Sequence, residues 1–129
     1  SGCRLKRMGA TIERHWYRHY FGRVFATGAS LVLGLPIYDT QCGAKLLRAE
    51  LAGILFERPF ISRWLFDIEL LARMIQLLGR KKVMTSVVEL PLERWEDKGE
   101  SKVKLLYIPK VPFELLLIGL TYRKYLYKK

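Results

Sequence analysis

Two polar runs set among apolar residues constrain this chain more than any other feature. Residues 39–45 (DTQCGAK) combine a carboxylate, an amide, a turn glycine and a lysine, and residues 63–71 (RWLFDIELL) combine an arginine, a tryptophan and two carboxylates. Such runs are typical of polar clefts on rigid scaffolds, where a packed framework holds polar groups in place. The sequence therefore predicts a folded scaffold with a polar cleft.

The composition fits one folded domain or part of one. Half of the 129 residues are hydrophobic and 27% are charged, which argues against intrinsic disorder. The formal net charge of +11 indicates an anionic partner: nucleic acid, an acidic membrane face or a phosphate-bearing substrate. Cys3 and Cys42 form neither a disulfide framework nor a metal motif, so we expect a reducing, cytosol-facing setting.

Hydrophobic spacing predicts several helices and a few short strands. Valine-rich residues 83–90 give the clearest strand signal, and Gly79 is the expected C-cap of the helix before it. Helices interleaved with few strands indicate an α/β or α+β chain that forms one flank of a larger sheet. The expected helices are residues 11–33, 49–56, 65–78 and 109–127, and the other expected strands are residues 37–38 and 44–47.

The acidic and aromatic residues of the two runs have more than one interpretation. Asp39 opens a turn closed by Gly43, where an aspartate either caps its own backbone or serves a site. Asp67 and Glu69 lie two apart on a helix and point about 200° from each other, so one is expected to face the cleft and the other to support it or cap the helix. Trp64 either packs in the core or stacks on a sugar.

Both runs resemble the acceptor side of inverting family 2 glycosyltransferases that move a hexose from a nucleotide sugar to a polyprenyl phosphate. Dolichyl-phosphate glucosyltransferases and dolichol-phosphate mannose synthases are examples of this group. The matching patterns are Asp-Thr-Gln-Cys-Gly-x-Lys and Arg-Trp-x-Phe-Asp-x-Glu-Leu-Leu, with Ala44 in place of the usual aromatic residue. The resemblance runs from Gly2 to about Leu105 and implies an α/β fold: the C-terminal part of a GT-A transferase, with a mixed sheet flanked by helices.

The resemblance also implies a division of the chain. Residues 1–107 would be the acceptor-side half of the transferase domain, and residues 108–129 a C-terminal amphipathic, membrane-proximal helix. The sequence contains no glycine-rich phosphate loop and no Asp-x-Asp pair, so we expect the nucleotide-binding half to be absent and this chain alone to be inactive. The expected location is peripheral, at the cytoplasmic face of a membrane.

Site residues follow from the resemblance position by position. Gly2-Cys3-Arg4 resembles the Gly-Ser-Arg of the family, and Arg14 and Arg18 project from the expected helix after it, so these three arginines are assigned to the acceptor phosphate. In the loop 99–103, Glu100 is inserted relative to the family's Gly-Ser-Lys-Val. The catalytic residues implied are Asp39, Asp67 and Glu69, and the cleft residues are Gln41, Cys42, Gly43, Lys45, Arg63, Trp64, Ser101 and Lys102.

The implied chemistry is a direct displacement at the anomeric carbon. The leaving group is a nucleoside diphosphate, and the nucleophile is a lipid phosphate that is already ionised and must be held in line by positive charge. Mg²⁺ or Mn²⁺ is expected in the complete enzyme and none on this chain alone, since His15 and His19 have no third ligand nearby. The implied partners are a nucleotide sugar, a polyprenyl phosphate and an anionic membrane surface, and no nucleic acid.

Two alternatives stay open at this point. A family 2 transferase that elongates a polysaccharide or lipopolysaccharide would need a general base, with Asp67 or Glu69 as the candidate. A basic nucleic-acid-binding module would use the helix expected at residues 11–33 as its phosphate contact.

Overall fold

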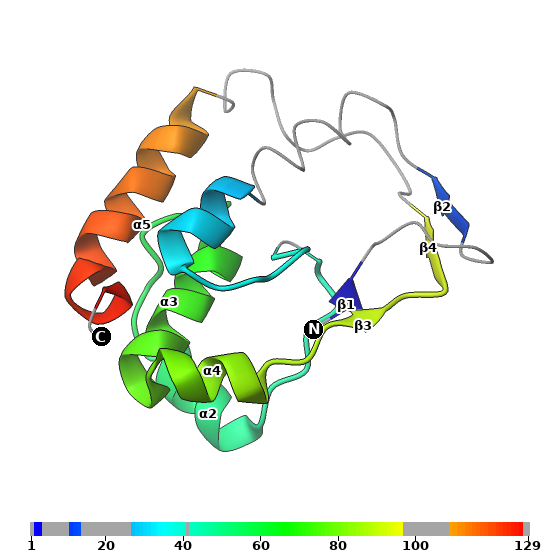
Figure 1. The fold of residues 1–129 in the computed structure, drawn as a ribbon, viewed down its shortest axis with the longest axis horizontal. Coiled ribbons are helices and arrows are strands. Elements are labelled where there is room, and N and C mark those ends of the chain that lie inside the picture. Colours follow the sequence, from blue (N-terminus) through cyan, green and yellow to red (C-terminus); the bar gives the residue numbers. More distant parts are fainter. Residues whose placement is uncertain (1, 4–10, 14–26, 41, 97–108, 128–129) are drawn as a thin grey trace.

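The computed structural model describes residues 2–3, 11–13, 27–40, 42–96 and 109–127, and this part of the chain is mostly helical (Figure 1). Its centre is helix α3 (Phe66–Leu78), which buries most of its length. The helices α2 (Ala49–Leu55), α4 (Arg80–Ser86) and α5 (Lys110–Leu126) lie around α3. The predicted helices at residues 49–56, 65–78 and 109–127 are therefore confirmed to within two residues at each end.

Local sequence explains the extent of α3. Ile68, Leu71 and Ile75 recur at helical spacing and are buried in the core. The helix ends at Gly79, whose φ of 81° is a conformation that glycine adopts without steric penalty, and whose N–H group donates to the carbonyl of Ile75 at 2.9 Å. The predicted C-cap is confirmed.

Helix α5 packs against α3 and against the helical residues 27–33. Ile118, Tyr122 and Leu126 share one side of α5 and are buried. A Cβ atom added at Gly119 would lie 3.1 Å from Val32 Cγ1, so the missing side chain permits the close approach of the two helical segments.

The strand predicted at residues 83–90 is wrong for most of its length. Residues 80–86 form α4, and the chain is extended only from Val87. Val83 and Val87 lie four residues apart and both pack on the core, while Val88 is exposed, so the valines follow helical rather than strand periodicity. Tertiary packing thus overrides the β propensity of valine here.

Two pairs of short parallel strands complete the described part. β1 (Gly2–Cys3) pairs with β3 (Leu90–Pro91), and β2 (Thr11–Glu13) pairs with β4 (Arg94–Glu96). The helix predicted from Thr11 is therefore wrong at its start, where β-branched Thr11 and Ile12 favour the extended form. Residues 14–26 of that prediction lie outside the described residues.

The described residues contain only a small part of the mixed sheet expected for an α/β fold. No strand forms at residues 37–38 or 44–47, both predicted to be extended strands. Within the described ranges the strands make two separate two-stranded pairs, not one mixed sheet. The helical layer of the prediction is present, and the site described next lies where the segment before α2 meets α3.

Candidate functional site

The first polar run, residues 39–45, contains a turn whose residues Thr40 and Cys42 are buried. The N–H group of Cys42 donates to the carbonyl of Asp39 at 3.5 Å, and the side chains of Thr40 and Cys42 are buried while Gly43 is exposed. Asp39 and Lys45 are half-buried. The turn thus presents its charged groups at the boundary between core and solvent.

A carboxylate from a distant part of the chain holds the beginning of this turn. Glu89 Oε1 accepts from the N–H of Asp39 at 2.9 Å, and Glu89 Oε2 accepts from the N–H of Tyr38 at 3.0 Å. Residues 89–92 (ELPL) resemble a Glu-Val-Pro-Val strand of the same transferase family, but no role was predicted for Glu89. Its partners lie 50 and 51 residues earlier, and no local pattern signals such a pairing.

An ion pair joins the end of the turn to α3 and so brings the two polar runs together. Lys45 Nζ lies 2.7 Å from Asp67 Oδ1, and it also donates to the carbonyl oxygen of Cys42 at 2.5 Å. Both charged side chains are mostly buried, which reduces solvent screening of the pair. The lysine of the first run and the first acidic residue of the second are therefore direct partners.

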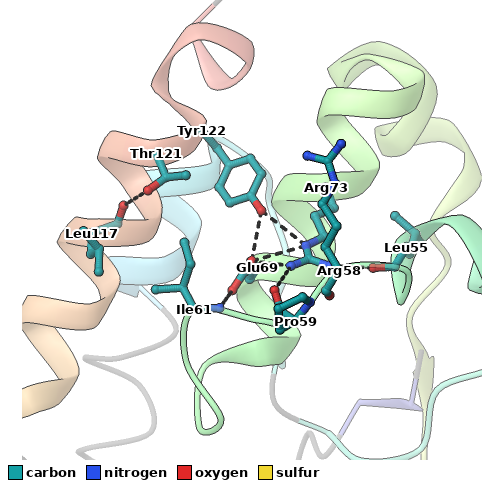
Figure 2. A network of polar contacts seen from close by, with 9 residues as sticks. All are labelled: Leu55, Arg58, Pro59, Ile61, Glu69, Arg73, Leu117, Thr121 and Tyr122. Carbon is teal, nitrogen blue, oxygen red and sulfur yellow. Dashed lines mark hydrogen bonds and ion pairs between the residues drawn. The ribbon is translucent and has the colours of Figure 1, made fainter.

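The second acidic residue of α3 lies in the interior (Figure 2). Glu69 has no exposed surface, and its carboxylate accepts from Arg73 Nη2 at 2.8 Å, Tyr122 Oη at 2.9 Å and the N–H of Ile61 at 2.7 Å. The predicted divergence of Asp67 and Glu69 is confirmed, because one meets Lys45 and the other meets Arg73 and Tyr122. These surroundings favour a structural role for Glu69; its catalytic assignment stays a prediction.

Arg73 extends the same network to the segment before α3. Its guanidinium donates to the carbonyl oxygens of Leu55, Arg58 and Pro59 at 2.6–2.7 Å (Figure 2). Its Cζ atom also lies 4.1 Å from the ring centroid of Phe60. Arg73 was not predicted to matter, although Glu69 and Arg73 stand four apart on a helix, the spacing at which an acidic and a basic side chain meet.

The network shifts the acid–base properties of two members. Burial raises the pKa of Tyr122, and the hydrogen bond and charge of Glu69 raise it further, against the opposing effect of Arg73. Burial alone would lower the pKa of Arg73, but its interactions with Glu69 and Tyr122 outweigh burial and raise it. Both residues therefore keep their protons more firmly than free side chains do.

The remaining predicted site residues have different positions. Trp64 is half-buried against the core, which fits the packing interpretation, and Arg63 is exposed. Ser62, not predicted, is buried; it donates to Glu114 of α5 and accepts from the N–H of Leu65 at 2.9 Å. The predicted residues that lie outside the described part are Arg4, Arg14, Arg18, Gln41, Ser101 and Lys102.

The described residues do not fit a divalent-metal site. Nowhere in residues 27–40, 42–96 and 109–127 do three His, Cys, Asp or Glu side chains come together. The acidic groups nearest the turn are already engaged, since Asp67 pairs with Lys45 and Glu89 accepts from two N–H groups. The Mg²⁺ or Mn²⁺ expected for a complete enzyme stays a prediction.

Comparison with known proteins relates the chain to one kind of transferase. It is 38% identical over 87 residues to a dolichyl-phosphate beta-glucosyltransferase of Trichomonas vaginalis, and 31% identical over 111 residues to a second one. A dolichyl-phosphate beta-glucosyltransferase of Mus musculus is 35% identical over 114 residues, which are 85% of this chain. The chain is a distant homologue of these transferases. The resemblance seen in the two polar runs is confirmed.

The homology covers only part of each relative. The matches span 67%, 83% and 85% of this chain but 24%, 32% and 32% of the three relatives, so the chain corresponds to about a third or less of their length. No family model matches the chain. No solved structure matches it either.

Replacing Tyr122 with phenylalanine tests the buried network. Loss of the hydroxyl leaves Glu69 with one partner fewer, so Tyr122→Phe is expected to lower the free energy of unfolding by about 1–3 kcal/mol at pH 8. Because the pKa of Tyr122 is raised in the folded state, the native hydroxyl contributes fully below pH 10 and its contribution falls as pH rises through the folded pKa. Urea unfolding between pH 8 and 11 measures both effects.

The matched control is Tyr125→Phe on the same helix, where the side chain is 37% exposed. It should leave stability within about 0.5 kcal/mol of the parent. A stability difference between Tyr122→Phe and the parent that stays constant up to pH 11 would contradict the proton linkage.

Proposed function

We propose that this chain is the acceptor-side part of an inverting hexosyltransferase that moves glucose or a related hexose from a nucleotide sugar to a polyprenyl phosphate. The observation that carries the proposal is the direct contact between the two runs that resemble this family, made by Lys45 and Asp67. Homology to dolichyl-phosphate beta-glucosyltransferases over most of the chain supports the same assignment.

The proposal includes a GT-A architecture for the complete domain. The strand pairs β1–β3 and β2–β4 are two and three residues long, too short to be stable alone. Parallel pairs also occur almost only in sheets covered by helices, as α3 and α4 would provide here. We propose that the two pairs belong to the mixed sheet of a transferase domain.

The proposed chemistry assigns different tasks to the charged groups. A lipid phosphate is ionised at neutral pH and attacks the anomeric carbon without strong base assistance, provided that cations hold it in line. Lys45 is engaged by Asp67, so most of the positive charge for the phosphate is assigned to Arg4, Arg14 and Arg18. Asp39, whose backbone is held in a fixed turn, is proposed to orient the sugar or acceptor.

The polysaccharide-elongating alternative receives less support. It needs a free general base at Asp67 or Glu69, and the first carboxylate is paired with Lys45 while the second is paired with Arg73. A carboxylate already engaged by a cation is less available to accept a proton from a substrate hydroxyl. No structural observation favours the nucleic-acid-binding alternative.

A transfer assay on the longest natural form of the protein tests the proposal. We expect glucose transfer from a nucleotide sugar to dolichyl or undecaprenyl phosphate, and we expect Asp39→Asn to lower kcat by about 10–100-fold because a misoriented reactant loses the benefit of positioning. Glu57→Gln, at an exposed carboxylate, is the matched control and should keep full activity. Transfer to an oligosaccharide but not to the lipid phosphate would contradict the proposal.

We further propose that α5 lies at an anionic membrane surface. None of the described helices is long and apolar enough to cross a bilayer. However, the side of α5 away from α3 exposes Phe113, Leu116 and Leu120, each by more than half, and Arg123 and Lys124 follow at its end. An apolar stripe with cations beside it fits the interface of acyl chains and anionic headgroups.

Vesicle sedimentation tests this surface. The chain is expected to bind vesicles containing phosphatidylserine more tightly than neutral vesicles, and Phe113→Ser is expected to weaken binding about tenfold or more, since burial of such a side chain contributes about 1.5–3 kcal/mol. Ile54→Ser, at an apolar residue that α2 exposes, is the control and should change nothing. Equal binding to both vesicle types would count against the role of the cations.

A further inference from the structure

The Glu89 carboxylate makes a two-point contact with the backbone of the candidate site. Its two oxygens accept hydrogen bonds from the successive N–H groups of Tyr38 and Asp39, at 3.0 and 2.9 Å. Hydrogen bonds to an ionised acceptor are stronger than those between neutral groups. Two of them from one carboxylate restrain the orientation of two consecutive peptide planes.

We propose that Glu89 is a positioning residue for Asp39, and this inference rests on the function proposed above. In this role Glu89 acts through the backbone from which the Asp39 side chain projects. No pattern in the sequence and no comparison assigns it this role.

Apolar side chains surround part of the Glu89 carboxylate. Its side chain borders a cavity of about 110 Å³ that is otherwise lined by apolar residues of two segments. The half-buried carboxylate is thus partly shielded from water in its contact with Asp39, while its contact with Tyr38 is exposed. The apolar lining residues are Leu35, Pro36, Ile37, Val83, Met84 and Val87.

The other end of the turn is held in a similar way. Lys45 pairs with Asp67 and donates to the carbonyl of Cys42. The two ends of the turn, Asp39 and Lys45, are therefore each held by a carboxylate, and the two carboxylates come from different elements. One carboxylate belongs to α3 and the other to the segment after α4. The turn therefore needs both for a single orientation, and loss of Glu89 releases the end that carries Asp39.

The chemistry of the contact selects glutamate over its nearest analogues. Glutamine would place a donor NH₂ group against one of the two backbone N–H donors, so only one hydrogen bond could survive. Aspartate keeps the charge but is one methylene shorter, so it could approach only one of the two N–H groups without a backbone shift. We expect Glu89→Gln to be the more severe change and Glu89→Asp to be intermediate.

The test combines hydrogen exchange with kinetics on the longest natural form of the protein. In Glu89→Gln, amide exchange should accelerate about tenfold or more at Tyr38 or Asp39, whichever N–H group loses its acceptor, while exchange at Leu71 and Ile75 inside α3 stays unchanged and verifies the fold. The kcat for transfer to polyprenyl phosphate should fall about 10–100-fold with KM changed by less than about threefold. Glu93→Gln, an exposed carboxylate four residues further on, is the matched control.

Each outcome decides the inference. Unchanged exchange at Tyr38 and Asp39 would overturn the contact itself. Faster exchange with unchanged kcat would overturn the positioning role while leaving the proposed function intact. If the parent protein transfers no sugar, the proposed function fails and the positioning role falls with it, while the exchange rates still decide whether Glu89 holds the turn.

Discussion

The buried carboxylate of Glu69, which needs hydrogen-bond partners from three segments, organises the described part of this chain. Glu69 has no contact with solvent, and burying an ionised group is strongly unfavourable unless charges and hydrogen bonds compensate it. The compensation comes from Arg73 on the same helix, Tyr122 on α5 and the backbone of Ile61. Helix α5 and the segment before α3 can therefore occupy only positions that complete this network.

The candidate site depends on that constraint because it uses the same helix. Asp67 precedes Glu69 by two residues, so the interior contacts of Glu69 also set the direction in which Asp67 meets Lys45. Glu89 then fixes the opposite end of the turn. One end of the turn is thus held by Asp67, on a helix whose rotation Glu69 fixes from the interior, and the other end by Glu89 in the segment after α4. Such pre-organisation is what the positioning of a substrate requires.

Local sequence patterns predicted the elements that local patterns control. The extents of α3 and α5 and the Gly79 cap follow from apolar spacing and glycine chemistry. The patterns failed where distant packing decides: α4 forms in place of a valine-rich strand, and β2 forms where a helix was expected. The Glu89 contacts, which join residues 50 and 51 positions apart, have no local signature at all.

A double-mutant cycle on Glu69 and Arg73 tests the central claim most directly. Removal of either partner leaves the other as a buried charge without its counter-ion. Each of Glu69→Leu and Arg73→Leu is therefore expected to lower the free energy of unfolding by about 3–5 kcal/mol. The double variant should lose less than the sum of the two, with a coupling energy of about 1–3 kcal/mol by urea unfolding. Losses that add to within about 0.5 kcal/mol would contradict the network as the organising interaction.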